Sequence, residues 1–226
     1  MMYDMNIVLF GTSGMIGQGV LRECLLDPDV NRVLSIVRKP TGQRHEKMRE
    51  LVHDDFLDFS GVEAELQGFY ACFFCLGVTS AGMTEEAYER VTYGFTLAAA
   101  QTLVKLNPGM TFIYVSGSGT DSTEKGRTMW ARVKGRTENA LLALPFKAAY
   151  MFRPGFIQPL HGIQSRTKVY RVFYVVLGPL FPALRAIFPR TITTTEQLGR
   201  AMLAVARDGY PKQVLEARDI TGVVPS

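Results

Sequence analysis

The chain contains few of the residues that build disulfide or metal frameworks. Its 226 residues include three cysteines and three histidines. An odd number of cysteines does not suit a fully paired disulfide scaffold, and the histidines lack the spacing of metal ligands, so we expect no metal site. Two cysteines form CFFC in an apolar run, where an offset of three residues puts side chains on opposite faces of a strand. We therefore expect reduced thiols and a cytoplasmic protein.

Long hydrophobic runs and a strong charge of one sign are also missing. The longest apolar candidate, residues 172–184, is interrupted by Gly178, Pro179 and Pro182, and it falls short of the roughly 20 residues of a spanning helix. The first residues do not have the basic head and cleavage site of a signal peptide. A net charge of +4, from 25 basic and 21 acidic residues, is too small to indicate a nucleic-acid-binding protein.

Short β-branched or aromatic runs alternate with segments of helical period along the chain. We expect helices over residues 15–26, 84–106 and 129–144, and a last one that begins after Thr194 or Thr195, with Gln197 completing a capping box, and ends near Gly209. The strands are expected at NIVLF, RVLSIVR, ELVHDDF, ACFFCL, TFIYVS and AAYMFRP. This alternation predicts an α/β protein, a doubly wound parallel sheet of six strands, as one domain over residues 1–226.

A glycine-rich turn follows the first expected strand and opens the first helix. Glycines at this junction allow a tight turn and a close approach of the main chain to a pyrophosphate, which the helix N-terminus attracts. The alternative is a closely packed turn that binds nothing. The candidate cofactor-binding residues here are Gly11, Thr12, Ser13, Gly14, Met15, Ile16 and Gly17.

The ends of the next strands suggest which nucleotide would bind. The second strand ends in Arg38 and Lys39 without an acid, which favours the 2′-phosphate of NADP over the free ribose of NAD, although a solvated basic pair is the alternative. After the third strand, Asp55 could hold the adenine amino group with Phe56 beside the ring. After the fourth strand, the residues expected under the pyrophosphate and ribose are Leu76, Gly77, Val78 and Thr79.

The ordered set GTSGMIG, RKP, DDF, CLGVTS, YVSGSGTD, VKG and FRPG resembles the atypical branch of the short-chain dehydrogenase/reductase superfamily, in particular the Tat-interacting-protein-like group and its bacterial relatives. The resemblance implies a Rossmann fold with bound NADP(H), and it adds Pro154 to the expected cofactor contacts. In catalytic members a Tyr donates a proton, a Lys four residues later holds the nicotinamide ribose, and a Ser after the fifth strand steadies the substrate. Here Lys134 and Ser116 match the Lys and Ser, whereas Trp130 occupies the position of the Tyr.

An indole N–H donates a hydrogen bond but has no proton to transfer, so Trp130 cannot be the acid. No tyrosine of the chain is followed by lysine at the fourth position. The alternative is that Trp130 packs in the core, yet Trp130, Lys134 and Glu138 recur at helical spacing on one face. His161 could be a replacement acid or an incidental loop residue.

The segment over residues 156–195 is aromatic and broken by prolines. We interpret it as a cap over the substrate, with a subunit or protein interface through residues 160–190 and docking on a membrane surface as alternatives. The sequence thus predicts an NADP(H)-binding reductase-like protein that acts on an unknown small molecule, such as an electron-poor carbonyl, a quinone or a flavin, without the usual tyrosine. A nonenzymatic NADP(H)-dependent sensor or scaffold that binds a protein partner, a Rossmann domain with an empty cleft, and a homo-oligomer all stay open.

Overall fold

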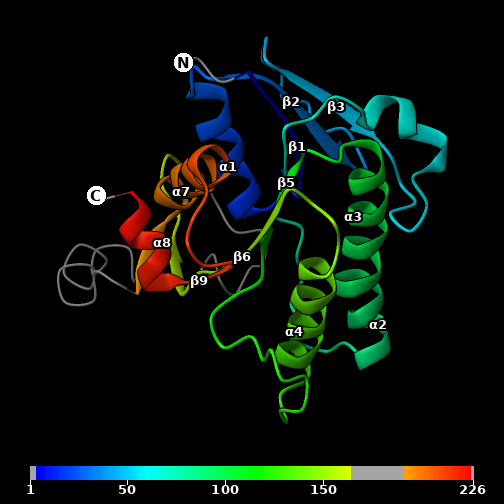
Figure 1. Cartoon of the computed structure of the whole chain (residues 1–226), viewed down its shortest axis with the longest axis vertical. Coiled ribbons are helices and arrows are strands. Elements are labelled where there is room, and N and C mark those ends of the chain that lie inside the picture. Colours follow the sequence, from blue (N-terminus) through cyan, green and yellow to red (C-terminus); the bar gives the residue numbers. More distant parts are fainter. Residues whose placement is uncertain (1–3, 164–190, 225–226) are drawn as a thin grey trace.

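A computed structural model of the chain describes residues 4–163 and 191–224. Its main sheet has seven parallel strands in the order β3-β2-β1-β4-β5-β6-β9 (Figure 1). This order reverses direction between β1 and β4, which is the defining feature of a doubly wound sheet, and it confirms the predicted fold class. The strands are β1 (Met5–Phe10), β2 (Val30–Val37), β3 (Met48–Val52), β4 (Ala71–Phe74), β5 (Thr111–Val115), β6 (Ala148–Arg153) and β9 (Val214–Glu216).

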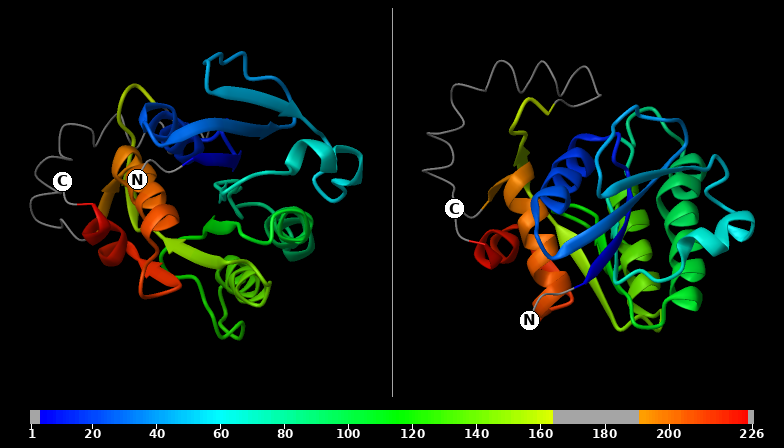
Figure 2. Two further views of the ribbon diagram at one scale, coloured as in Figure 1. Left: turned by 45° about the horizontal axis from the view of Figure 1, so that its top comes forward. Right: turned by 90° about the horizontal axis from the view of Figure 1, so that it is seen from above.

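Helices cover both faces of this sheet (Figure 2). On one face lie α1 (Met15–Leu26) and α7 (Thr195–Asp208), whose Val20 and Leu198 belong to one hydrophobic core. On the other lie α3 (Phe95–Leu106) and α4 (Met129–Leu142), whose Leu103 and Leu141 belong to a second core. All residues of β4 and β5 are buried, as expected for strands covered on both faces. Two of the shorter helices are η1 (Ser60–Leu66) and α8 (Ala217–Val223).

Several element boundaries differ from the sequence-based prediction. The prediction of six strands missed β9, a three-residue edge strand that pairs with β6. The third strand ends at Val52, so the segment HDDF lies beyond it. The expected helix over residues 84–106 has three parts: α2 (Glu85–Glu89), the π-helical turn η2 (Arg90–Gly94) and α3.

The ends of the predicted cap segment form a second, small sheet. In it β7 (Phe156–Gln158) pairs in parallel with β8 (Ile192–Thr194), and most of the segment between them, residues 164–190, lies outside the described residues. The hydroxyl of Thr194 caps α7 by accepting from the Gln197 main-chain N–H at 3.0 Å. The Gln197 side chain donates to the Val224 carbonyl instead of completing the capping box, so that part of the prediction was wrong.

Two further expectations concern the cysteines and the membrane. Cys72 and Cys75 are unpaired thiols that pack into the two different cores, on opposite faces of the sheet. Over residues 4–163 and 191–224, no helix combines the length and the apolar character needed to cross a bilayer.

Candidate functional site

The glycine-rich turn between β1 and α1 has no room for side chains at two of its positions. Gly11 adopts φ +84°, and a Cβ there would lie 2.6 Å from the Cys75 carbonyl carbon at the end of β4. A Cβ at Gly17 would lie 2.1 Å from the Gly11 carbonyl oxygen. Between them, the Gly14 N–H donates to that same oxygen at 2.8 Å. Glycine is therefore needed at Gly11 and Gly17 to fold the turn tightly against β4.

Within the described residues, no side chain caps the N-terminus of α1. Gly14 is the N-cap and forms no side-chain cap, and the first turn contains no acid. The hydroxyls of Thr12 and Ser35 share a buried hydrogen bond of 2.7 Å, which ties the turn to β2. Because the first amides of a helix have no intrahelical acceptor and carry a partial positive charge, this end can receive an anion. The turn therefore fits a pyrophosphate.

Sequence reasoning missed Ser35, whose signal is a single polar residue inside the apolar run RVLSIVR. Thr12 is 1% exposed and its hydroxyl is already paired with Ser35, so its side chain is not available to a ligand.

The strand registers bring the other candidate residues to the same edge of the sheet. Phe10 is paired with Ile36 and with Phe74, and Val115 with Phe152. Since parallel strands end at a common edge, the residues that follow these pairs meet around the glycine-rich turn. These are Arg38 and Lys39 after β2, Leu76, Gly77, Val78 and Thr79 after β4, Ser116 after β5 and Pro154 after β6.

Arg38 and Lys39 are exposed, and neither forms an ion pair with any part of the chain that the structure describes. Both are thus available to an anion at the end of β2. Gly77 and Thr79 are also exposed, and Val78 is 39% exposed.

The structure separates the two candidates for adenine contact. Asp55 is exposed, and its carboxylate accepts from the Leu57 N–H at 2.9 Å. Phe56 is only 3% exposed, and its ring packs edge-on against Phe10 and Phe95. Phe56 therefore belongs to the core, which leaves little of its surface for a nucleotide base.

Ser116 lies at the end of β5 with its hydroxyl turned into the protein. The side chain donates to the Glu138 carboxylate at 2.5 Å and lies 3.2 Å from the Phe152 carbonyl oxygen. Only 6% of the residue is exposed. The Ser116 hydroxyl therefore faces a buried carboxylate from α4.

Lys134 and Trp130 both meet the loop that follows β5. The Lys134 ammonium donates to the Ser116 carbonyl oxygen, and burial lowers its pKa to about 8, an effect that the Glu138 carboxylate opposes. A Cβ at Gly119 would lie 3.5 Å from the Trp130 indole, so this ring packs over the same loop. The helical spacing of Trp130, Lys134 and Glu138 thus brings three side chains together beside the end of β5.

Glu138 also joins the site to the far edge of the sheet. Arg153 at the end of β6 donates from Nε to both Glu138 oxygens at 3.0 and 3.1 Å. From its other side, Arg153 reaches Glu216 in β9 at 3.1 Å and the Ser122 hydroxyl at 2.5 Å. Hydrogen bonding to Glu138 raises the pKa of Arg153, so the guanidinium stays charged.

The sequence reasoning named Glu138 only for its helical spacing and did not identify Arg153 as its partner. The available signal was one arginine at the end of an otherwise apolar strand.

His161 is engaged with the N-terminal turn of α7. Its Nε2 lies 2.7 Å from the Glu196 carboxylate, and its backbone has φ +56°. That hydrogen bond lowers the pKa of Glu196. The described contacts therefore place His161 as a partner of α7 and do not pair it with Lys134 or Trp130.

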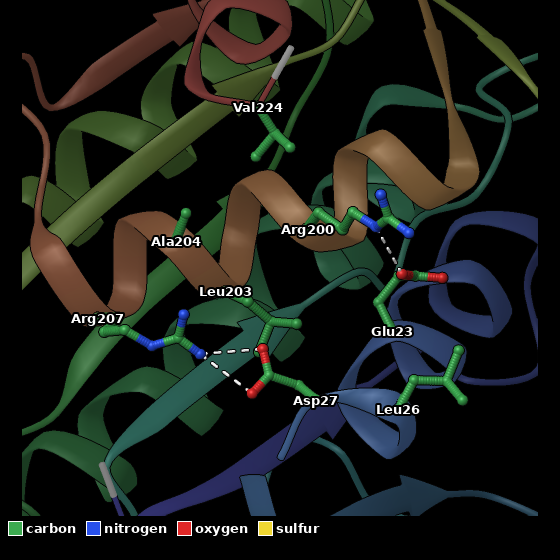
Figure 3. Close-up of a pocket in the computed structure, with 8 residues that line it drawn as sticks. All are labelled: Glu23, Leu26, Asp27, Arg200, Leu203, Ala204, Arg207 and Val224. Atoms are coloured by element: carbon green, nitrogen blue, oxygen red, sulfur yellow. Dashed lines mark hydrogen bonds and ion pairs between the residues drawn. The ribbon is translucent and has the colours of Figure 1, made fainter. Parts of the chain in front are cut away.

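A hollow of about 350 Å³ lies between α1 and α7 (Figure 3). Arg200 reaches across it to Glu23 at 3.1 Å, and Arg207 reaches to Asp27 at 2.9 Å. Glu23 and Asp27 are near the C-terminal end of α1, at the opposite edge of the sheet from the glycine-rich turn. This hollow is therefore separate from the candidate nucleotide site.

No model of a known protein family matches the chain. It is 27% identical to the protein FMP52-2, mitochondrial, of Scheffersomyces stipitis, over 95% of this chain and 96% of that one. It is 26% identical to the protein HTATIP2 of Rattus norvegicus, over 69% of this chain and 64% of the relative.

Solved structures share the fold at low identity. The enzyme WbmF of Bordetella bronchiseptica in complex with NAD+ gives a TM-score of 0.68 at 14% identity, covering 98% of this chain and 77% of that chain. A short chain dehydrogenase family protein from Francisella tularensis gives 0.67 at 14% identity, covering 94% of this chain and 96% of that one.

The relatives correct the expected location and support the resemblance seen in the motifs. Several of them are named as mitochondrial proteins, which contradicts the prediction of a cytoplasmic protein. Reduced cysteines do not distinguish the cytoplasm from other reducing compartments, so that inference was too narrow. The motif order, the doubly wound sheet and the similarity to HTATIP2 agree with one another. In the order of its motifs and in its fold, the chain is therefore similar to the atypical branch of the short-chain dehydrogenase/reductase superfamily and to the Tat-interacting-protein-like group.

Proposed function

We propose that this chain binds a nicotinamide nucleotide, with NADP(H) preferred over NAD(H), and acts as an oxidoreductase on a small molecule. The observation that carries this proposal is the uncapped, acid-free N-terminus of α1, held in a glycine-rich turn where the strand order reverses. WbmF, which shares the fold, was solved with NAD+. Isothermal titration tests the first step, because failure to bind either NADPH or NADH at millimolar concentration would contradict the proposal.

A bound nicotinamide would supply the hydride, and the residues of the chain would orient it and its substrate. In this proposal the amides around Gly14 hold the pyrophosphate, Lys134 holds the nicotinamide ribose, and Pro154 and the residues after β4 line the path between them. The segment over residues 156–195 caps the substrate. Suitable acceptors are electron-poor carbonyls, quinones and flavins, whose reduction makes a modest demand on an acid. Steady-state oxidation of NADPH against a panel of carbonyls and quinones is the direct assay.

The preference for NADP(H) rests on Arg38, which is exposed at the end of β2 and has no ion-pair partner among the described residues. We predict that Arg38→Ala weakens NADPH binding roughly 10-fold or more, since a charge-assisted contact with a phosphate contributes about 1.5–3 kcal/mol. Binding of NADH should change little, because it has no 2′-phosphate. Isothermal titration with both nucleotides measures this difference.

Arg44→Ala is the matched control, since Arg44 is also exposed and lies farther along the same connection between β2 and β3. It should leave both affinities unchanged. An equal loss of NADPH and NADH binding in Arg38→Ala would remove Arg38 from the 2′-phosphate.

A second candidate function is a nonenzymatic sensor or scaffold, in which nucleotide binding controls contact with a protein partner. Trp130 favours it, because the usual proton donor of the superfamily is replaced by a side chain without a transferable proton. A protein that binds NADPH but oxidises it with no acceptor of the panel would support this function over the oxidoreductase.

The names of the relatives support a mitochondrial location, which fractionation of cells that express the full chain would test.

A further inference from the structure

Reduction of a carbonyl to an alcohol requires a proton, and the side chains beside the end of β5 differ in whether they can donate it. The Trp130 indole N–H does not ionise in water. The Ser116 hydroxyl is buried and donates to Glu138 at 2.5 Å. Lys134 is half-buried, and its ammonium lies on the loop side of α4. We propose that the Lys134 ammonium is itself the proton donor of this site, held in place by Ser116 and by the Glu138–Arg153 ion pair; this inference rests on the proposed function.

Only one of the N–H bonds of the Lys134 ammonium has an acceptor among the described residues. It carries three N–H bonds, and one donates to the Ser116 carbonyl oxygen. Among the described residues it makes no other hydrogen bond. A Cβ at Gly117 would lie 3.9 Å from Nζ, so the absence of a side chain at Gly117 keeps the space beside the ammonium open. The two remaining N–H bonds are therefore free for the nicotinamide ribose and a substrate oxygen.

Ser116 positions Lys134 and connects it to Glu138. Ser116 links the two groups, because its carbonyl accepts from Lys134 and its hydroxyl donates to Glu138. Glu138 is 1% exposed and is fixed by Arg153. A buried carboxylate costs folding free energy unless it is paired. The ion pair with Arg153 therefore allows Glu138 to stay charged close to Lys134, while the carboxylate itself bonds to Arg153 and Ser116 and not to the ammonium.

The other ionisable groups that the structure describes close to Lys134 or to Glu138 are neutral or already paired. Tyr114 of β5 is buried and its pKa is raised by desolvation, so it stays neutral. On the loop after β5, the Asp121 carboxylate accepts from the Gly126 N–H at 2.7 Å. Glu216 of β9 reaches Arg153 and not Lys134. Two effects therefore determine the pKa of Lys134: burial lowers it and the Glu138 carboxylate raises it. Burial is the larger effect, and the pKa falls to about 8.

A donor with this pKa is charged near neutral pH and can still give up its proton. A bound nicotinamide would supply the hydride, with its electron pair, to the carbonyl carbon of a substrate, and Lys134 Nζ would give a proton to the carbonyl oxygen. One N–H bond breaks and one O–H bond forms, which leaves an alcohol and a neutral amine. A proton from the solvent then restores the ammonium.

The decisive variant is Lys134→Arg. Arginine keeps the positive charge and the donors but does not release a proton at accessible pH. We expect kcat for carbonyl reduction to fall roughly 100-fold or more, the usual contribution of a general acid, while the NADPH dissociation constant measured by titration changes only a few-fold. Lys105→Arg is the control, because Lys105 is an exposed lysine on α3. A Lys134→Arg enzyme as fast as the wild type would overturn the inference.

The pH profile gives an independent readout. In the wild type, kcat for a carbonyl should fall as the pH rises through about 8, because the charged form of Lys134 is the donor. Glu138→Gln keeps an acceptor for Ser116 but removes the negative charge, so the fall should move to lower pH; Glu138→Asp, which keeps the charge, should move it less. A profile that stays in place in Glu138→Gln would contradict the inference. If Glu138→Gln does not fold, the Lys134 titration followed by carbon NMR in the wild type decides, and a pKa near 10 would overturn it.

The failure of this inference is distinguishable from failure of the proposed function. Wild-type protein that binds NADPH but reduces no acceptor contradicts the oxidoreductase and, with it, any proton donor. Wild-type turnover that persists in Lys134→Arg contradicts only the role of Lys134. Wild-type turnover that is lost in Lys134→Arg, with nucleotide binding retained and the Lys105→Arg control unaffected, supports both.

Discussion

Single glycines decide whether the nucleotide-binding turn can form. Gly11 faces two separate constraints, a backbone with φ +84° and a main-chain neighbour that a Cβ would approach to 2.6 Å. Strain in the left-handed region alone costs an L-residue about 1–2 kcal/mol. A clash with backbone atoms adds to this cost, because the end of β4 cannot move without disturbing its pairing with β1.

We predict that Gly11→Ala lowers the free energy of unfolding by several kcal/mol and abolishes NADPH binding. Urea denaturation and isothermal titration measure the two effects. Gly42→Ala is the matched control, since Gly42 has φ +79° and nothing within 4 Å of the added Cβ. It should lose only about 1 kcal/mol, the cost of strain. Equal losses in the two variants would show that strain, and not the close approach to β4, explains the requirement for glycine.

The sequence predicted which residues of α4 lie together at the site, but it did not predict the direction of the Ser116 side chain. The spacing of Trp130, Lys134 and Glu138 placed them on one face, and the structure brings all three to the loop after β5. Ser116 was expected to face a substrate, whereas its hydroxyl donates to Glu138. That direction depends on Arg153, which holds Glu138 from another strand. A contact between segments so far apart in the chain has no local signature.

At the scale of elements, α4 and the loop before it form one unit. Asp121 of this loop donates its N–H to the Ala131 carbonyl at 3.0 Å, and its carboxylate accepts from Gly126. Gly135 in the middle of α4 lets the loop approach, since a Cβ there would lie 1.8 Å from the Asp121 carbonyl oxygen. The helix therefore fixes the loop that Trp130 packs against.

In Gly135→Ala, the higher helix propensity of alanine opposes the clash of its methyl group with the loop. In an open helix interior this change stabilises by about 1 kcal/mol. Here the main chain and the side chain of Asp121 are both hydrogen-bonded, so the loop cannot move away from the added methyl group. We therefore predict a net destabilisation of roughly 1–3 kcal/mol, typical of overpacking. Thermal or urea denaturation measures it. Gly222→Ala in α8 is the control, because a Cβ at Gly222 has nothing within 4 Å, and it should be neutral or stabilising. Stabilisation in both variants would mean that the loop yields easily.

The elements that the sequence predicted well are those with strong local signals. The buried strands β1, β4 and β5 are short apolar runs bounded by turn residues, and α1 ends at Leu26, as expected, with Asp27 and a proline directly after it. The missed strand β9 has three residues, too few for a periodic pattern, and it is defined by its pairing with β6. The π-helical turn η2 lies inside a continuous helical pattern, so its extra residue per turn could not be seen in the sequence.

At the scale of the whole molecule, one buried ion pair connects the candidate site to the last strand of the sheet. Arg153 joins Glu138 of α4 to Glu216 of β9, and through Glu138 it reaches Ser116. Arg153 is 8% exposed and Glu138 1% exposed, so neither charge is solvated well if its partner is lost. The edge strand, the helix and the site are therefore stabilised together.

Removing both partners of this ion pair should cost less stability than the two single removals added together. We predict that Arg153→Met alone destabilises by about 3–5 kcal/mol, because Glu138 is left buried and uncompensated, and that Glu138→Leu alone has a similar effect. In the double variant the loss should be clearly smaller than the sum, since no buried charge remains at this position. The Ser116 hydroxyl would still have an acceptor in the Phe152 carbonyl at 3.2 Å. Urea denaturation of the four proteins measures the coupling, and additive losses would show that the two charges act independently.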